Sequence, residues 1–96
     1  MRRSIITNDT SKCYECGCTQ NLERHHCIHG TAGRKLADKY GLTVMLCIEC
    51  HKGTKGVHGR DGAELDLKLK RIAQEAWEAK YGDRQDWHRI FGKSYL

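Results

Sequence analysis

The clearest hydrophobic periodicity in the chain is helical and lies in its last third. Small and apolar residues recur there at helical spacing, at Leu65, Leu69, Ile72, Ala73, Ala76 and Trp77. This pattern predicts an amphipathic helix from about 63 to 81. Asp61 and Glu64 have capping-box spacing at its start, and Gly82 provides its end.

A second, shorter helix is expected directly after the long one. Asp83 is a favoured helix cap, and Trp87, Ile90 and Phe91 fall on one helical face before Gly92. The aromatic residues of the two helices are expected to pack in the core rather than stack on bases. Residues of about 61–96 therefore form a helical extension.

The first half of the chain favours two short strands with a helix between them. Residues 22–28 and 43–46 are bounded by turn residues and are predicted to be strands. Residues 34–40 can form two helical turns that end at Gly41. The strands can pair antiparallel, which makes the fold class α+β. Residues 1–12 are polar and lack periodicity, so we expect a flexible N-terminal arm before a single domain over 13–96.

Cysteine spacing adds a metal to this picture. Two CxxC pairs, Cys13–Cys16 and Cys47–Cys50, supply the four thiolates of a tetrahedral zinc site. Structural zinc contributes about 10–16 kcal/mol in small domains, which matches their whole stability of about 5–15 kcal/mol. We therefore expect a structural Zn²⁺ that pins residues 13–16 against 47–50.

Other uses of the six cysteines are disulfides in a secreted protein or a redox CxxC motif. The N-terminus lacks the apolar segment of a signal peptide, no stretch reaches transmembrane length, and no βαβ pattern accompanies the motifs. We therefore expect a cytoplasmic protein without a membrane partner; the resemblance described below implies a bacterial or phage-infected cell. Cys18 and Cys27 are expected to be small packing residues.

The histidines lie next to the cysteine motifs. His25 and His26 precede the second pair, and His51 and His58 follow it, so zinc closure would bring them together. Adjacent strand residues point to opposite faces, so one of the two neighbouring histidines can bind a metal while the other acts as a base. Imidazole titrates near neutral pH, with a pKa of about 6.5, and a divalent cation can stabilise a phosphodiester transition state. In the alternative, the histidines are polar surface residues of a zinc ribbon.

These residues resemble an HNH endonuclease of the zinc-bound type. The similarity covers residues 13 to about 60 and rests on LERHH over 22–26, VMLCIECH over 44–51 and the later His58. The C-terminal FGKSYL, with the helix before it, is similar to the ends of small HNH proteins of phages and prophages. The resemblance implies a ββα-metal core, also called a His-Me finger, with a four-cysteine zinc site and a C-terminal helix pair.

Carried over by position, the resemblance implies that His26 is the general base and that His25, His51 and His58 bind the catalytic cation. That cation would be Mg²⁺, Mn²⁺, Ni²⁺ or Zn²⁺. Leu42 stands where the family has its middle asparagine, and His51 and His58 are seven residues apart instead of one helical turn. Gly53 and Gly56 argue against a continuous helix between them.

The net charge of +5 fits an anionic partner. The function expected from the resemblance is metal-dependent hydrolysis of phosphodiester bonds in double-stranded DNA, with a phage packaging protein or another protein supplying the target. The alternative is a non-catalytic zinc-dependent nucleic-acid-binding module, which Leu42 favours. His29 is expected to be solvated or DNA-facing rather than a ligand, and His88 is expected to be a surface residue of the last helix. Basic residues expected to contact DNA are Arg34, Lys35, Lys52, Lys55 and Arg60.

Overall fold

A computed structural model describes residues 3–96, so the first two residues of the expected arm lie outside it. The described chain is an α+β fold with one two-stranded sheet and four helices. In chain order the elements are β1 (Leu22–His26), α1 (Thr31–Tyr40), β2 (Thr43–Cys47), α2 (Ile48–Lys52), α3 (Ala63–Lys80) and α4 (Arg84–Phe91). Each predicted strand and helix is present, within a few residues of the expected bounds.

The sheet is an antiparallel pair whose register runs from Leu22 opposite Cys47 to His26 opposite Thr43. The helix α1 connects the two strands, and its C-terminal Gly41 has a left-handed φ of 74°. A Cβ at Gly41 would also lie 2.4 Å from the carbonyl oxygen of Arg3. Glycine is therefore required both for the turn into β2 and for the passage of the N-terminal segment.

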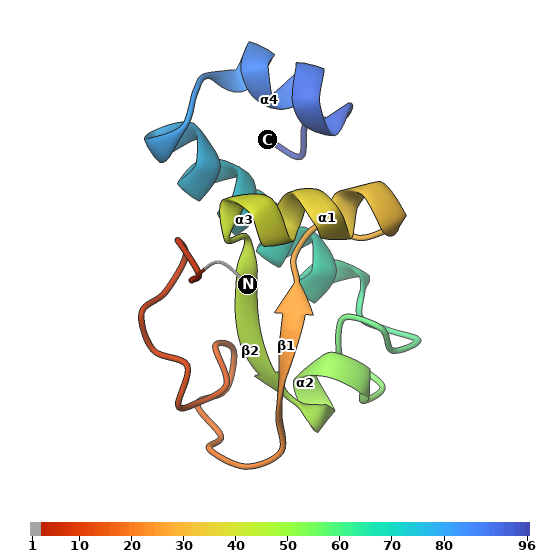
Figure 1. Cartoon of the computed structure of the whole chain (residues 1–96). Helices are drawn as coiled ribbons and strands as arrows, with labels where there is room; N and C mark the ends of the chain where they lie inside the picture. The colour runs from red at the N-terminus through yellow and green to blue at the C-terminus, as the bar shows by residue number, and fades with distance from the viewer. Residues whose placement is uncertain (1–2) are drawn as a thin grey trace.

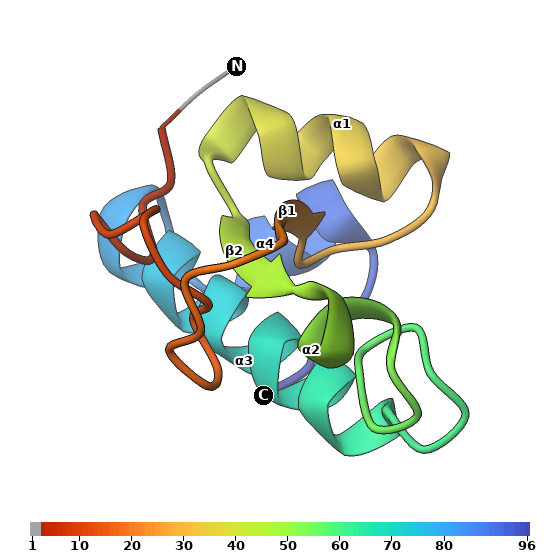
Figure 2. The ribbon, with the colours of Figure 1, turned by 90° about the horizontal axis from the view of Figure 1, so that it is seen from below.

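Helices cover the sheet on more than one side. Figure 1 shows α1 across the end of the strands where β1 leads into it, with α3 behind the sheet and α4 beyond α3. Figure 2, turned by 90°, places the strands between α1 and α3, with α2 beside the start of α3. The radius of gyration is 12.8 Å, close to the value of about 13 Å for a compact domain of 100 residues. The helical extension thus packs onto the cysteine-containing half.

An aromatic cluster joins three of the helices. The rings of Trp87 and Phe91 on α4 stack at 3.8 Å, and Trp77 on α3 meets Trp87 edge-on at 5.7 Å. Tyr40, from the end of α1, contacts Trp77 at 5.8 Å. Trp77 and Trp87 are at most 2% exposed, and buried aromatic pairs of this kind add about 0.5–1.5 kcal/mol beyond area burial. Both tryptophans are core residues, as the sequence predicted.

Two local features differ from the sequence prediction. The helix α3 begins after Gly62, without a side-chain cap, so Asp61 does not form the expected capping box. The Asp61 carboxylate instead lies 3.4 Å from the guanidinium of Arg60. The short helix α2 follows the strand directly and was not predicted, because five residues are too few to show helical periodicity. At α4, by contrast, Asp83 and Asp86 form a reciprocal capping box.

The described part of the N-terminal segment has no helix or strand. It contacts the fold where Ile5 donates its N–H to the Gly41 carbonyl at 2.9 Å and the Ser4 hydroxyl donates to the Thr43 carbonyl at 2.6 Å. No helix within residues 3–96 combines the length and apolar character needed to cross a membrane.

Candidate metal centres

The two CxxC motifs converge into one cluster of thiols. The four side chains, called the cysteine cluster here, offer sulfur atoms within 4.8 Å of one another and belong to Cys13, Cys16, Cys47 and Cys50. The Sγ atoms of Cys16 and Cys47 are 3.6 Å apart, whereas zinc–sulfur bonds of about 2.3 Å place tetrahedral thiolates about 3.8 Å apart. The spacing suits one zinc ion and is too long for a disulfide, and all six cysteines of the chain, which lie within residues 3–96, are free.

The backbone around the cysteine cluster favours a thiolate. Burial raises the pKa of the Cys13 thiol, but hydrogen bonds from the backbone at Cys16, Cys47 and Glu15 outweigh it and hold the pKa at about 6. Burial and the neighbouring thiols raise the pKa of Cys50. A cation would therefore be needed to keep all four sulfurs deprotonated together.

The two remaining cysteines are separate from this cluster. Cys27 is fully buried, and burial raises the pKa of its thiol to about 12, so it is an inert packing residue as expected. Cys18 is exposed, so its predicted role in packing is wrong. It lies in the turn after the first motif, where its sulfur faces the carbonyl of Gln20 at 3.7 Å.

Strand alternation separates the side chains of β1 into two sets. Glu23 and His25 point towards α2, where Glu23 contacts His51. Arg24 and His26 point the other way, where Arg24 donates to the Thr43 hydroxyl at 3.1 Å and His26 contacts α1. The adjacent histidines therefore have different surroundings, as the strand prediction required.

The first set contributes to a group of three imidazoles. This group, called the histidine cluster here, comprises His25, His51 and His58, and its ligand nitrogens lie within 4.8 Å of one another. Burial and the nearby imidazoles lower the pKa of His25 to about 3, and burial also lowers the pKa of His58. Both rings are neutral near pH 7, which is the form that binds metals.

His25 has a nitrogen with no protein partner. Within residues 3–96, two buried side-chain polar atoms lack a hydrogen bond, His25 Nε2 and Trp77 Nε1. Trp77 is surrounded by the aromatic core, but His25 is 1% exposed and lies among side chains that could bind a metal. An unsatisfied buried polar group costs about 1–3 kcal/mol. A cation at the histidine cluster would satisfy this nitrogen, so the residues fit a metal.

A tight loop brings His51 and His58 together, although they are seven residues apart in the sequence. The N–H groups of Val57 and His58 donate to the carbonyls of Cys50 and His51, at 2.9 and 3.0 Å. The chain thus folds back on α2, and the two imidazole rings lie 4.8 Å apart. The backbone at Gly62 passes close to the backbone at Gly56 in this loop. A Cβ at Gly62 would lie 1.6 Å from the carbonyl oxygen of Gly56.

His51 is oriented by a carboxylate. Its Nδ1 lies 2.8 Å from Oε1 of Glu23, which leaves Nε2 for a metal. The other Glu23 oxygen accepts from Lys52 at 3.2 Å. Hydrogen bonds from His51 and Lys52 lower the pKa of Glu23. Carboxylates commonly orient metal-binding imidazoles in this way, and Glu23 was not identified from the sequence.

His26 is held by a different carboxylate. Its Nε2 is 2.7 Å from Oδ1 of Asp38 on α1, and its side chain is 17% exposed. Because an ionised carboxylate only accepts hydrogen bonds, Asp38 favours the tautomer that carries its proton on Nε2, which leaves Nδ1 free to accept one. Leu42 is a fully buried core residue. Its carbonyl accepts from the N–H of Cys27 at 3.0 Å.

The histidines line a cavity of about 430 Å³. This histidine cavity is bounded by Arg24, His25, His26, His29, Gly30, Arg34, His51 and His58. His26 and the histidine cluster therefore open onto one space, together with the guanidinium groups of Arg24 and Arg34. Of the residues expected to contact DNA, Arg34 lies here.

The contacts of His29, like the role of Glu23, were not predicted from the sequence. Its Nε2 contacts Oδ1 of Asp66 on α3, and Lys70 approaches the other carboxylate oxygen at 2.9 Å. Burial raises the pKa of Asp66, but the contacts with His29 and Lys70 outweigh it and lower the pKa. His29 is therefore not simply solvated, and it borders the histidine cavity from the side of α3.

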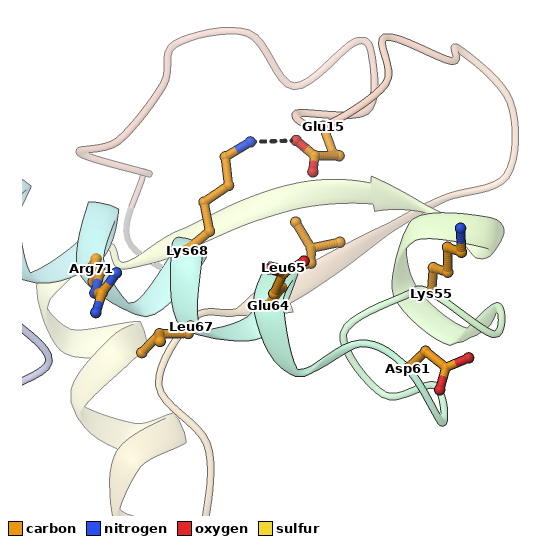
Figure 3. Close-up of a pocket in the computed structure, with 8 residues that line it drawn as sticks. All are labelled: Glu15, Lys55, Asp61, Glu64, Leu65, Leu67, Lys68 and Arg71. Atoms are coloured by element: carbon orange, nitrogen blue, oxygen red, sulfur yellow. Dashed lines mark hydrogen bonds and ion pairs between the residues drawn. The ribbon is translucent and has the colours of Figure 1, made fainter.

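A second hollow, of about 510 Å³, lies between the first CxxC loop and α3 (Figure 3). Its charged residues have both signs, and Glu15 pairs with Lys68 at 2.8 Å. Exposed pairs of this kind contribute about 0–1 kcal/mol. Lys55 lines this hollow and not the histidine cavity. Lys35 and Arg60 are exposed outside both, and Lys52 pairs with Glu23.

Comparisons with known proteins found no match, whether to a family model, to a curated protein or to a solved structure.

The two metal centres should respond differently to substitution. We expect Cys47→Ser to unfold or severely destabilise the domain, because it removes a thiolate from a site that supplies much of the folding energy. His58→Ala should lower the affinity of the second metal with a milder effect on stability. Elemental analysis and thermal melts of both variants provide the measurement. Equal losses of stability would contradict the division into a structural and a second centre.

The loop that returns His58 to α2 should not tolerate a side chain at Gly62. We expect Gly62→Ala to displace the loop, because its Cβ would overlap the backbone of Gly56. Metal affinity at the histidine cluster should fall while zinc at the cysteine cluster is retained. Gly33→Ala is the control, since its Cβ would meet only the Ile28 side chain and backbone at 3.0 Å or more. Similar metal affinities in both variants would argue against this role of the loop.

Proposed function

We propose that the protein is a metal-dependent endonuclease of the HNH type that hydrolyses phosphodiester bonds in DNA. The observation that carries this proposal is the histidine cavity, where His26, oriented by Asp38, borders the same space as the histidine cluster. The antiparallel strands followed by α2 also suit the ββα-metal core that the resemblance implies.

The residues divide the chemical work as follows. His26, with Nε2 held by Asp38, has Nδ1 available to take a proton from water. The water oxygen forms the new bond to phosphorus as the bond from phosphorus to the 3′ oxygen breaks. The 3′ oxygen takes up a proton from solvent, which leaves a 5′-phosphate and a 3′-hydroxyl. A divalent cation, when bound by the histidine cluster, supplies positive charge near the leaving oxygen.

Two guanidinium groups support binding of a phosphate. Arg24 and Arg34 both line the histidine cavity, and guanidinium pairs well with phosphate oxygens. Arg24 is fixed by the Thr43 hydroxyl at 3.1 Å. The net charge of +5 adds a general attraction for nucleic acid.

A zinc-dependent module that binds nucleic acid without cleaving it is the second candidate. Leu42 favours it, because a buried leucine replaces the polar side chain that the HNH family has at this position. Asp38 favours the enzyme, since an orienting carboxylate for His26 has little use in a passive binder. Asp38 is itself 47% exposed in its side chain, so it is accessible to solvent.

Plasmid cleavage tests the two candidates directly. We expect relaxation of supercoiled plasmid with at least one of Mg²⁺, Mn²⁺, Ni²⁺ and Zn²⁺, and its loss in His26→Ala by about 10²–10⁴-fold. Fold, structural zinc and DNA binding should be retained in this variant. His88→Ala is the matched control, because His88 is exposed on α4. Wild-type activity in His26→Ala across the metals would exclude His26 as the base, and DNA binding without cleavage by the wild type would favour the second candidate.

DNA binding should depend steeply on salt, and part of that dependence should come from the loop around His58. Each phosphate contact contributes a slope of about −0.9 in log K against log salt. Replacing Lys52, Lys55 and Arg60 with Ala should flatten the slope by up to about three units. Cleavage at saturating DNA should survive in the Lys55→Ala, Arg60→Ala double variant, which leaves the pair of Lys52 with Glu23 intact.

The control for this salt titration is a triple Ala variant of exposed basic residues outside this loop, Lys80, Arg84 and Lys93. It removes the same formal charge and should change the slope less. Equal changes in the two triple variants would mean that DNA does not favour the loop. An unchanged slope in the loop variant would exclude the loop as the DNA-facing surface.

A further inference from the structure

The histidine cluster has a fourth imidazole beside it. The ring of His29 lies 5.2 Å from that of His25 and 5.2 Å from that of His58. The three rings of the cluster are themselves 4.8, 5.3 and 5.5 Å apart. His29 is therefore as close to His25 and His58 as the members of the cluster are to one another, and one of its ligand nitrogens lies within 4.8 Å of one on His25.

These separations agree with rings arranged around a single tetrahedral ion. With metal–nitrogen bonds of about 2.1 Å, two imidazoles on a tetrahedral ion have ring centres about 5.2 Å apart. On an octahedral ion, neighbouring rings would be closer, at about 4.5 Å by the same geometry. The measured distances of 4.8–5.5 Å lie nearer the tetrahedral value.

His29 is also held in the manner of a metal ligand. Asp66 contacts its Nε2, just as Glu23 contacts Nδ1 of His51. Lys70 fixes the second oxygen of Asp66 at 2.9 Å. Each imidazole thus has one nitrogen on a carboxylate and one left for an ion, the arrangement that commonly orients metal-binding histidines.

The nitrogen of His25 without a partner points to the same conclusion independently. His25 Nε2 is buried and unsatisfied, and His25 belongs to two groups of potential ligands. One is the histidine cluster, and the other comprises His25, His29 and Asp66, with ligand atoms within 4.8 Å of one another. His25 therefore lies between the α2 loop and α3.

We propose that His29 is a fourth protein ligand of the ion in the histidine cluster, and that Asp66 fixes the orientation of its ring. The inference rests on the proposed metal site but not on the nuclease chemistry. Four neutral imidazole nitrogens favour Zn²⁺, Co²⁺ or Ni²⁺ over Mg²⁺, which prefers oxygen ligands. The centre would then select a transition-metal ion.

Cobalt titration of the whole protein tests this assignment without DNA. The cysteine cluster is first filled with one equivalent of Zn²⁺, and Co²⁺ is then added while its visible absorption is followed. Tetrahedral Co²⁺ absorbs much more strongly than octahedral Co²⁺, and the absence of sulfur charge-transfer bands shows that the added Co²⁺ avoids the cysteines. We expect an intense tetrahedral spectrum, and weak octahedral bands would overturn the four-histidine shell.

Two substitutions separate a ligand from a tether between the loop and α3. His29→Gln keeps an amide that can donate to Asp66 but removes the imidazole, so Co²⁺ affinity should fall more than about 100-fold and the tetrahedral bands should weaken. Asp66→Asn should lower affinity by about 10–100-fold, as outer carboxylate partners of metal-binding histidines do. The matched controls, His88→Gln and Glu64→Gln, should leave both affinity and spectrum unchanged.

The outcomes are distinct. Wild-type affinity and spectrum in His29→Gln would show that His29 is only a tether, and the proposal would fail. A larger loss in Asp66→Asn than in His29→Gln would make Asp66 the ligand and would also overturn it. A protein that shows the expected titrations but cleaves no plasmid would disprove the nuclease and leave the four-histidine site intact.

Discussion

The antiparallel register of β1 against β2 is the constraint on which both candidate centres depend. It places Leu22 opposite Cys47, so the chain leaving the first CxxC turn meets the second at one end of the sheet. It also turns His25 towards α2 and His26 towards α1. Because strand side chains alternate, a slip of one residue would exchange these two faces. The His25 ring would then face Asp38 on α1, and the histidine cluster would lose its most buried member.

The two candidate centres differ in their donor atoms. The cysteine cluster joins segments that are far apart in sequence and suits a closed sulfur shell, the form that structural zinc takes. The histidine cluster has neutral donors, borders a cavity and is surrounded by oriented carboxylates. Zinc at the cysteine cluster would supply folding energy to a small domain with a limited core. An ion at the histidine cluster would then not be needed for folding and could be bound less tightly.

The sequence predicted most helices, both strands and the grouping of the four CxxC cysteines, because these depend on local signals. Periodicity located α3, turn residues bounded the strands, and CxxC spacing identified the four thiols. The carboxylates were missed for a physical reason. Asp38 and Asp66 are ordinary polar residues of amphipathic helices, and only the rotation of α1 and α3 against the sheet decides that they meet His26 and His29. The same holds for His29, whose neighbours come from a segment 37 residues away.

The long helix α3 links the aromatic core to the histidine cavity. Asp66 and Trp77 are eleven residues apart, which is close to three full turns. They therefore project from nearly the same face of α3, about 16 Å apart along the helix axis. Leu69 and Ala73 occupy the turns between them and are fully buried. Because α3 is packed against the core along this whole face, it cannot rotate at one end alone. Repacking of the tryptophans would therefore move Asp66 relative to His29. The distant aromatic cluster would in this way affect how an ion is coordinated at the histidines.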